Sequence, residues 1–345
     1  RNGGEDSGYD LVWESAGKVT DSGYQIEMAV PFSSMRFPNQ QVQTWRVDFW
    51  RNHPRDVRGQ YSWAAYDRDE NCWPCQWGTV HGIEDVQPGR GVEIMPTVVG
   101  YQSGSLSDSD DPFSTFDNSD PDGELSLNGK YSVTSDIVVE ASYNPDFSQV
   151  EADADQIDVN TNFALSFAER RPFFQEGSDL FSTIFAAVYT RSINDPDFTA
   201  KVTARKERTS FAYLTAHDEN SPIIMPFEEG SAIFLGGKST SNIMRARQTF
   251  GENSHAGILV TDRRFEGGGS GSVLSLDGAV HLSQKYKFEW QTMATHTAEP
   301  DDSTITFDEG DPDFHYSTFD DGKYTAGFNG ESFWGNAYYF GINRE

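Results

Sequence analysis

The chain is short of basic residues, of cysteine and of long apolar runs. Its 345 residues hold 26 Lys and Arg against 54 Asp and Glu, a formal net charge of −28. Because phosphate binding needs clustered Lys and Arg, this balance excludes nucleic acid as a partner. No stretch of about 18 apolar residues occurs, which excludes a transmembrane helix. A transmembrane β-barrel stays open, because its strands alternate apolar and polar residues.

The only two cysteines are Cys72 and Cys75, in the stretch Cys72-Trp73-Pro74-Cys75. No His follows the second cysteine and no further metal ligands lie nearby, so haem attachment and a zinc site are excluded. Thioredoxin-type redox chemistry needs a cysteine that opens a helix, and no such helix is indicated. We expect a local disulfide in an oxidising envelope compartment, with two free thiols as the alternative.

Aromatic residues, in contrast, make up 14% of the chain, which favours ordered β-structure over an acidic disordered chain. The length predicts two units. A segment rich in Pro and Gly over residues 84–91 marks the boundary, giving domains 1–86 and 87–345. The polar start and the apolar end of the sequence predict a processed or partial chain.

Alternating strands with unequal connections are predicted in both domains. Residues 24–30 and 45–51 alternate in the first domain. In the second, residues 272–282 and 286–293 alternate around a short turn and precede a long acidic loop over residues 298–321. Short turns on one side and long polar loops on the other are typical of outer-membrane barrels. A soluble sandwich or propeller is the alternative, and a further hairpin is predicted over residues 324–339.

Two stretches carry a family resemblance: Asn144-Pro-Asp-Phe-Ser-Gln-Val-Glu-Ala-Asp153 and Ala168-Glu-Arg-Arg-Pro-Phe-Phe-Gln-Glu-Gly177. Together they resemble the signature of a family of large bacterial outer-membrane proteins. In that family a domain similar to family 9 carbohydrate-binding modules precedes a β-barrel-like domain of unknown function.

This resemblance implies an all-β chain. Residues 1–86 would be the C-terminal part of a family 9-like β-sandwich, and residues 24–30 and 45–51 resemble its closing hairpin. Residues 87–345 would supply antiparallel outer-membrane-type strands, as a whole or incomplete barrel with one short internal helix. The implied location is the outer membrane of a Gram-negative cell, with the N-terminal domain in the periplasm or on the surface.

Tryptophans are the candidate sugar platforms in the first domain. A flat indole stacks on the apolar face of a pyranose, and its N–H offers a directed hydrogen bond. Trp13, Trp50 and Trp63 are assigned this role, whereas Trp45 is assigned to the sandwich core.

Asn118, Asp120 and Asp122 form the candidate metal site. Oxygen ligands at alternate positions before Gly123 resemble the start of a calcium loop. The twelfth position holds Gly129 instead of the expected Glu, so a solvated acidic loop is favoured over a specific calcium site. We therefore expect no cofactor, with calcium as the alternative.

No nucleophile elbow and no His-Glu-x-x-His motif occurs. A pair of carboxylates that hydrolyses glycosides is not excluded. With 54 acidic residues in the chain, however, no particular pair is indicated by the sequence. The first hypothesis is therefore a non-enzymatic outer-membrane barrel that contacts lipid and carbohydrate, in glycan binding, glycan uptake or envelope organisation. The alternatives are a glycoside-active enzyme and a structural subunit that binds other envelope proteins.

The last prediction concerns residues 144–181. Residues 161–170 favour a helix, with Phe163 and Phe167 four residues apart. A helix that carries basic residues is costly in lipid, so we expect this segment to fold inward as a plug or rim element. Phe173 and Phe174 would then wedge against the barrel wall. The predicted ion-pair cluster comprises Asp146, Glu151, Asp153, Asp155, Glu169, Arg170 and Arg171.

Overall fold

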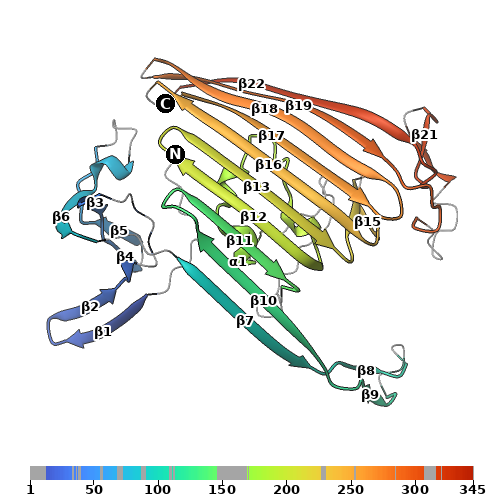
Figure 1. The fold of residues 1–345 in the computed structure, drawn as a ribbon, viewed down its shortest axis with the longest axis horizontal. Coiled ribbons are helices and arrows are strands. Elements are labelled where there is room, and N and C mark those ends of the chain that lie inside the picture. Colours follow the sequence, from blue (N-terminus) through green and yellow to red (C-terminus); the bar gives the residue numbers. More distant parts are fainter. Residues whose placement is uncertain are drawn as a thin grey trace. The chain divides into compact units, whose positions relative to one another are not determined.

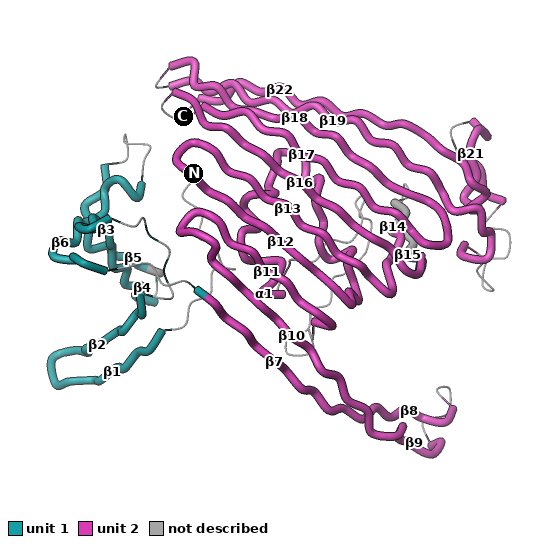
Figure 2. The backbone as a smooth tube through the Cα atoms, in the orientation of Figure 1, with its two compact units in different colours: residues 1–91 teal, residues 92–345 magenta. Residues whose placement is uncertain are grey.

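The computed structural model is mostly β-structure with few helices and divides into two compact units, residues 1–91 and 92–345 (Figure 2). Each unit is described by itself. The described residues are 13–32, 35, 37, 40–54, 57–67, 73–86, 91–108, 111, 113–145, 169, 171–226, 231–251, 254–283, 285–306, 316–319 and 321–344.

The first unit consists of three two-stranded antiparallel ladders and a short 3-10 helix, Trp73–Gln76. The paired strands are β1 (Glu14–Thr20) with β2 (Gly23–Ala29), β3 (Val42–Val47) with β6 (Gly78–Glu84), and β4 (Trp50–Pro54) with β5 (Arg58–Ser62).

Two details of this unit correct the sequence prediction. The expected single strand over residues 45–51 is interrupted at Asp48 and Phe49, where Asp48 turns its carboxylate back to accept the Phe49 N–H at 2.9 Å. The expected hairpin between residues 24–30 and 45–51 is wrong as well, because β2 pairs with β1 and β3 pairs with β6. A two-residue turn closes β1 onto β2, and such local closure costs less chain entropy than a long connection.

The second unit is built on one ten-stranded antiparallel sheet (Figure 1). Its order is β22-β19-β18-β17-β16-β13-β12-β11-β10-β7, so among the described residues the sheet is open at β7 and β22 and does not close into a barrel. The strands are β7 (Val92–Tyr101), β10 (Asp122–Ser132), β11 (Ile137–Tyr143), β12 (Pro196–Lys206), β13 (Thr209–Asp218), β16 (Ser239–Phe250), β17 (Ser254–Phe265), β18 (Ser270–Ser283), β19 (Tyr286–Ala298) and β22 (Ser332–Arg344).

Connections at the two ends of this sheet differ in length. At one end the strands are joined by residues 133–136, 207–208, 251–253 and 284–285. At the other end the connections are residues 102–121, 144–195, 219–238 and 299–331, with only residues 266–269 short. Three small hairpins extend from this second end (Figure 1). They are β8 (Gly104–Leu106) with β9 (Phe116–Asn118), β14 (Pro222–Pro226) with β15 (Ser231–Leu235), and β20 (Thr318–Phe319) with β21 (Tyr324–Thr325).

Sequence patterns placed some of these strands correctly. The strand at residues 272–282 and the one at 286–293 are neighbours, as expected, within β18 and β19. The hairpin expected over residues 324–339 is wrong. Tyr324 belongs to β21, which pairs with β20, whereas β22 pairs with the long strand β19. Pairing with β19 gives β22 a full-length partner, which a local turn at residues 329–331 could not.

The two faces of the ten-stranded sheet have opposite character. We call "inner" the face covered by Glu169 and residues 171–195, here named the inner segment, and "outer" the opposite face. The inner segment includes α1 (Pro172–Gln175) and the 3-10 turns Ser178–Leu180 and Thr190–Ser192, and α1 lies behind the sheet in Figure 1.

A small apolar core joins the inner segment to the middle of the sheet. Phe174, Leu180, Phe181 and Ile193 from the segment are buried against Ala212, Leu214, Ala216, Ile243 and Leu259 of β13, β16 and β17. Around this core the inner face is polar, and Thr199, Lys201, Arg245, Ser275, Asp277 and Gln291 are all buried there.

None of the described helices is long and apolar enough to cross a membrane. The helix expected over residues 161–170 lies outside the described residues, and the described helix in this region begins at Pro172. Proline is well suited to the first helical position because its fixed φ fits the helix and its missing N–H is not needed there.

Candidate functional site

Arg171 anchors the start of the inner segment. Its guanidinium binds the Glu169 carboxylate with two hydrogen bonds, Nε to Oε1 at 2.8 Å and Nη2 to Oε2 at 2.7 Å. It also donates to the carbonyls of Ile193 (2.6 Å) and Thr190 (2.8 Å) and lies over the Phe174 ring. Arg171 is only 3% exposed, so these partners replace the water that a buried cation loses.

Glu169 is held as a carboxylate by this geometry. Burial alone would raise the pKa of its carboxyl group, but the hydrogen bonds and charge of Arg171, together with a 2.6 Å hydrogen bond from the Thr190 hydroxyl, lower the pKa below its usual range. The pair therefore closes the inner segment into a loop, because residues 169–171 are tied directly to residues 190–193.

A second set of charges runs across four strands of the inner face. Glu93 of β7 is the cross-strand neighbour of Lys130 in β10, which neighbours Glu140 in β11, which in turn neighbours Lys201 in β12. We call this row the charge ladder. Lys201 binds Glu140 at 2.6 Å, and Lys130 reaches up to Glu176 of the inner segment at 2.7 Å.

Lys201 also fixes the inner segment directly. Its ammonium donates to the carbonyls of Phe173 at 2.5 Å and Glu176 at 2.7 Å and lies over the Phe173 ring. With the Glu140 bond, all three of its protons are used. The lysine is 1% exposed, so its junction with Glu140 and α1 is buried.

Further hydrogen bonds join the far end of the segment to the sheet. Asp218 accepts the backbone N–H groups of Asn194 and Asp195, at 3.1 and 2.6 Å. Gln291 of β19 accepts the Phe185 N–H at 2.7 Å, and Arg263 of β17 donates to the Ser192 hydroxyl at 2.8 Å. The segment is thus attached to strands on both sides of the sheet's centre.

The predicted ion-pair cluster is only partly within the described residues. Asp146, Glu151, Asp153, Asp155 and Arg170 lie outside them. Of the predicted acids, Glu169 is the one that the structure places beside Arg171. The partners Lys201, Glu140, Lys130 and Glu176 were missed. The alternating acidic and basic residues at positions 93, 130, 140 and 201 are far apart in the sequence. They form a row of neighbours only because their strands lie side by side in the sheet.

The outer face of the sheet, in contrast, exposes large apolar side chains. The most exposed include Val92, Ile94, Val98, Leu125, Tyr143, Leu282, Trp334, Tyr338, Phe340 and Ile342, with Trp334 at 76% and Val98 at 78%. Residues directly opposite each other on neighbouring strands lie on the same face of the sheet. The register of β19 and β22 therefore places Trp334 beside His296 and Phe340 beside Trp290.

In the first unit the predicted sugar platforms separate into different environments. Trp50 lies in a ring cluster with Tyr66 and Trp73, at centroid distances of 5.5 and 5.3 Å. Trp63 packs on Phe49 instead, and Trp13 is half exposed at the start of the described residues. The Tyr66 hydroxyl donates to Asp48, which gives the Trp50 cluster a polar rim. Trp73 and Tyr66 were missed, although Trp73 lies between the two cysteines.

Trp45 packs with Phe32 and Phe37, at centroid distances of 5.6 and 5.3 Å. Phe37 is 5% exposed. These rings form a local apolar cluster, whereas a place for Trp45 in a sandwich core stays a prediction.

Asn118, Asp120 and Asp122 lie where β9 ends and β10 begins. Asp122 accepts the Gly123 N–H at 2.7 Å, and all three residues are exposed. Calcium at this site stays a prediction. Cys75 has no free thiol, and Cys72 lies outside the described residues, so the bridge between them also stays a prediction.

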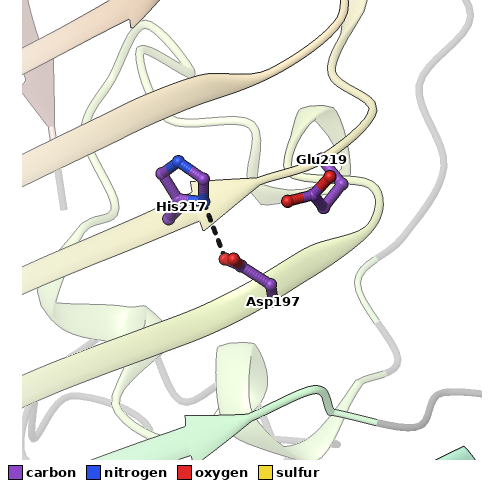
Figure 3. Close-up of side chains that lie close together, drawn as sticks. All are labelled: Asp197, His217 and Glu219. Atoms are coloured by element: carbon purple, nitrogen blue, oxygen red, sulfur yellow. Dashed lines mark hydrogen bonds and ion pairs between the residues drawn. The ribbon is translucent and has the colours of Figure 1, made fainter.

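A different group has the spacing of metal ligands. Asp197, His217 and Glu219 each offer one ligand atom, and these atoms lie within 4.8 Å of one another (Figure 3). Imidazole and carboxylates can bind zinc and similar ions. In the structure, however, His217 Nδ1 hydrogen-bonds Asp197 Oδ1 at 2.8 Å, and Lys238 binds Glu219 at 2.5 Å. His217 Nε2 also faces Glu266 at 3.6 Å, so the structure shows this group as an ion-pair network between β12, β13 and the connection that follows.

Comparison with known proteins gives one match. No curated protein and no solved structure matches the chain. Residues 98–213 match the family described as a domain of unknown function, DUF5916, and this match runs from within β7 to within β13 and includes the whole inner segment.

Proposed function

We propose that the second unit contributes strands to an outer-membrane β-barrel, with the outer face in lipid and the inner segment in the lumen, and that the first unit binds carbohydrate. One observation carries the membrane part of this proposal. The sheet exposes its apolar face and buries its charged face, which is the reverse of a soluble domain.

The outer face is extensive and continuous across the sheet. Large apolar side chains are more than 60% exposed near both edges of the ten-stranded sheet. They include Val98 of β7 and Leu125 of β10 at one edge and Phe340 of β22 at the other. Soluble monomers rarely expose apolar patches of more than a few hundred Å². Lipid chains would cover this surface without any protein partner.

Aromatic rings lie near both ends of the strands on this face. Tyr143 pairs with Phe198 at the end that carries the long connections, and Trp334 pairs with His296 at the same end, with ring centroids 4.5 Å apart. Tyr131 and Tyr286 lie at the end with the short turns and are exposed. Two aromatic belts at the levels of the lipid headgroups are typical of outer-membrane barrels.

Carbohydrate binding by the first unit is supported by the cluster of Trp50, Tyr66 and Trp73. Three rings lie within about 5.5 Å of one another, and Trp50 and Trp73 are 39% and 38% exposed. Aromatic faces beside the Asp48 carboxylate match a sugar, which presents apolar C–H groups and hydroxyl donors together.

Brominated lipids test the membrane part. The chain is reconstituted in vesicles whose acyl chains carry bromine at a fixed depth, and tryptophan fluorescence is recorded. We expect strong quenching that falls when Trp290 and Trp334 are replaced by Phe, because both face outward. Trp50→Phe is the matched control and should leave the fluorescence intensity lost to quenching unchanged. A native chain that stays monomeric in detergent-free buffer, with Trp334 unquenched, would contradict the proposal.

Oligosaccharide titration tests the carbohydrate part. Binding of a soluble glycan panel should weaken by about tenfold in Trp50→Ala or Trp73→Ala, the loss of one stacked ring. Trp334→Ala serves as the control outside the cluster. Equal binding by all three variants would remove the Trp50 cluster from the proposal, and release of reducing sugar would favour the glycoside-active alternative.

A further inference from the structure

A cavity of about 200 Å³ lies in the second unit between the charge ladder and α1. The sheet contributes Glu93, Asn128, Lys130 and Glu140 to its wall, and the inner segment contributes Phe173 and Glu176. All of these sheet residues point to the inner face. No residue of the Trp50 cluster and none of the exposed apolar residues named on the outer face lines the cavity, so neither part of the proposed function accounts for it.

Glu140 leaves one hydrogen-bond acceptor open at this cavity. Its Oε2 binds Lys201 at 2.6 Å, but among the described residues its Oε1 has no hydrogen-bond partner. Glu140 is 6% exposed, so bulk water does not compensate. A buried carboxylate oxygen without a donor is costly, and such groups point to a missing partner.

Lys201 cannot supply that partner. Its three ammonium protons already go to Glu140 Oε2 and to the carbonyls of Phe173 and Glu176. Lys130 is directed to Glu176, 2.7 Å away. Among the described residues no other donor reaches Glu140, so a molecule in the cavity would supply it.

The charge of the wall favours a cation. Three carboxylates, those of Glu93, Glu140 and Glu176, face the ammonium groups of Lys130 in the wall and of Lys201 bonded to Glu140, so the formal charge is 2 − 3 = −1. A neutral sugar or water would satisfy the open acceptor but not this charge. Met95, Ala141 and Pro172 complete the wall and offer apolar contact to a carbon chain.

A bare metal ion fits less well than an organic cation. Among the described residues, the carboxylate and imidazole atoms close enough to share one ion are those of Asp197, His217 and Glu219, and the three glutamates of the cavity are not among them. Carboxylates spread around a cavity suit a ligand with two separated donor groups. The volume also far exceeds the ~10–15 Å³ that holds a single water.

We propose that this cavity binds the ammonium group of a small organic cation, with Glu140 and Glu93 as its carboxylate partners and the apolar wall against its carbon chain. The ligand is a primary amine or diamine small enough for a cavity of about 200 Å³. Because it contacts both the ladder and α1, its binding would also stabilise the inner segment against the sheet.

Calorimetric titration of the full chain in detergent, at constant ionic strength, tests this with 1,4-diaminobutane. The matched neutral probe is 1,4-butanediol, which has the same length and also donates hydrogen bonds. We expect saturable binding of the diamine at least tenfold tighter than that of the diol. Glu93→Gln should weaken diamine binding by about tenfold, since a charge-assisted contact becomes a neutral one.

Two further variants make the test decisive. Asp117→Asn removes the same charge from the exposed strand β9 and should leave binding unchanged. Glu140→Gln should weaken diamine binding as well, and circular dichroism checks that the sheet remains folded in this variant. Glu93→Gln tests the cation site without changing the buried Glu140–Lys201 pair.

The proposal is overturned by equal binding of diol and diamine, by no saturable diamine binding in the millimolar range, or by unchanged binding in Glu93→Gln. Magnesium that binds more tightly than the diamine, and is lost in Glu93→Gln, would also overturn it in favour of a hard-cation site. The measurement is made in detergent, so its failure leaves the lipid-quenching result for the proposed function untouched.

Discussion

Arg245 and Asp277 form a bidentate ion pair that spans an entire strand. Arg245 belongs to β16 and Asp277 to β18, and the two guanidinium–carboxylate contacts, 2.5 and 2.7 Å long, cross over Gly257 in β17. A Cβ on Gly257 would lie 2.6 Å from Nη1 and 2.7 Å from Nη2 of Arg245. The glycine is therefore what lets the arginine reach its partner.

Gly257→Ala should break this pair and leave two buried charges without partners. We expect a loss of about 3–5 kcal/mol in the free energy of unfolding, the cost of breaking a buried pair. Urea unfolding in detergent measures it. Gly271→Ala, in the neighbouring strand, is the control because nothing lies within 4 Å of its added Cβ. Equal stability of the two variants would show that the pair contributes nothing.

Arg171→Lys should loosen the inner segment while keeping its charge. A lysine cannot bind Glu169 with two parallel bonds and also reach the carbonyls of Thr190 and Ile193. We expect proteolysis within residues 171–195 to accelerate by about ten- to hundredfold, which corresponds to about 1.5–3 kcal/mol of local stability. The exposed turn variant Arg208→Lys should be cut at the native rate, and a native rate for Arg171→Lys would contradict the anchor.

Glu169 should make the stability of the second unit fall on acidification. Its pKa is lowered in the folded chain, so its contribution is fully present above the unfolded value near 4.5 and is lost as pH falls through the folded pKa. Denaturation of the native chain and of Glu169→Gln should therefore differ most at neutral pH and converge below pH ~4. A difference that is constant from pH 7 to 3 would exclude this role.

Glu299 should have the opposite pH dependence. Burial and the nearby Glu331 raise its pKa to about 7, and one oxygen of its carboxyl lacks a partner among the described residues. A raised carboxyl pKa means that the folded state holds the proton more tightly, so stability is lost as pH rises from about 4.5 to 7. Glu299→Gln should match the native chain at pH 5 and exceed its thermal midpoint at pH 8. Glu207→Gln, in an exposed turn, should show no such crossover.

Cys72 and Cys75 should be bridged in protein taken from an oxidising compartment. The loop they close is so short that the bridge contributes no more than about 2 kcal/mol in the chain-entropy model. Its expected effect is to hold Trp73 beside Trp50, so reduction should weaken glycan binding more than it lowers stability. Thiol labelling of the unreduced, denatured chain measures the bridge, and two reactive thiols per chain would refute it.

Much of the fold could be predicted from alternation alone. Residues 286–291 alternate aromatic and polar side chains, and the structure places Phe288 and Trp290 on the outer face and buries Gln291 on the inner one. The unequal connections were also visible, because turns and acidic loops differ in composition. Alternation states which residues share a face, but not which strand lies beside which.

That limit explains the failures. The hairpin expected over residues 324–339 had a suitable turn, yet β22 gains more backbone hydrogen bonds from the 13-residue register with β19. Glu140 and Lys201 are 61 positions apart in the sequence, and only the 144–195 connection brings them together. The sequence places Trp73 only between two cysteines. Its contacts with Trp50 and Tyr66 depend on how separate segments of the first unit pack, which alternation does not predict.

The charge ladder also fixes how the strands align during folding. Sliding β12 past β11 by one residue would carry Lys201 to the apolar face, and if that face lies in lipid as proposed, a basic residue at the membrane midplane costs about 2–4 kcal/mol. Sliding by two would keep the faces but set Glu140 opposite Thr199 or Thr203 instead of Lys201. Both misalignments leave a charged side chain without its partner. The apolar pattern of the four strands alone would allow several alignments, and the row of alternating charges selects one of them.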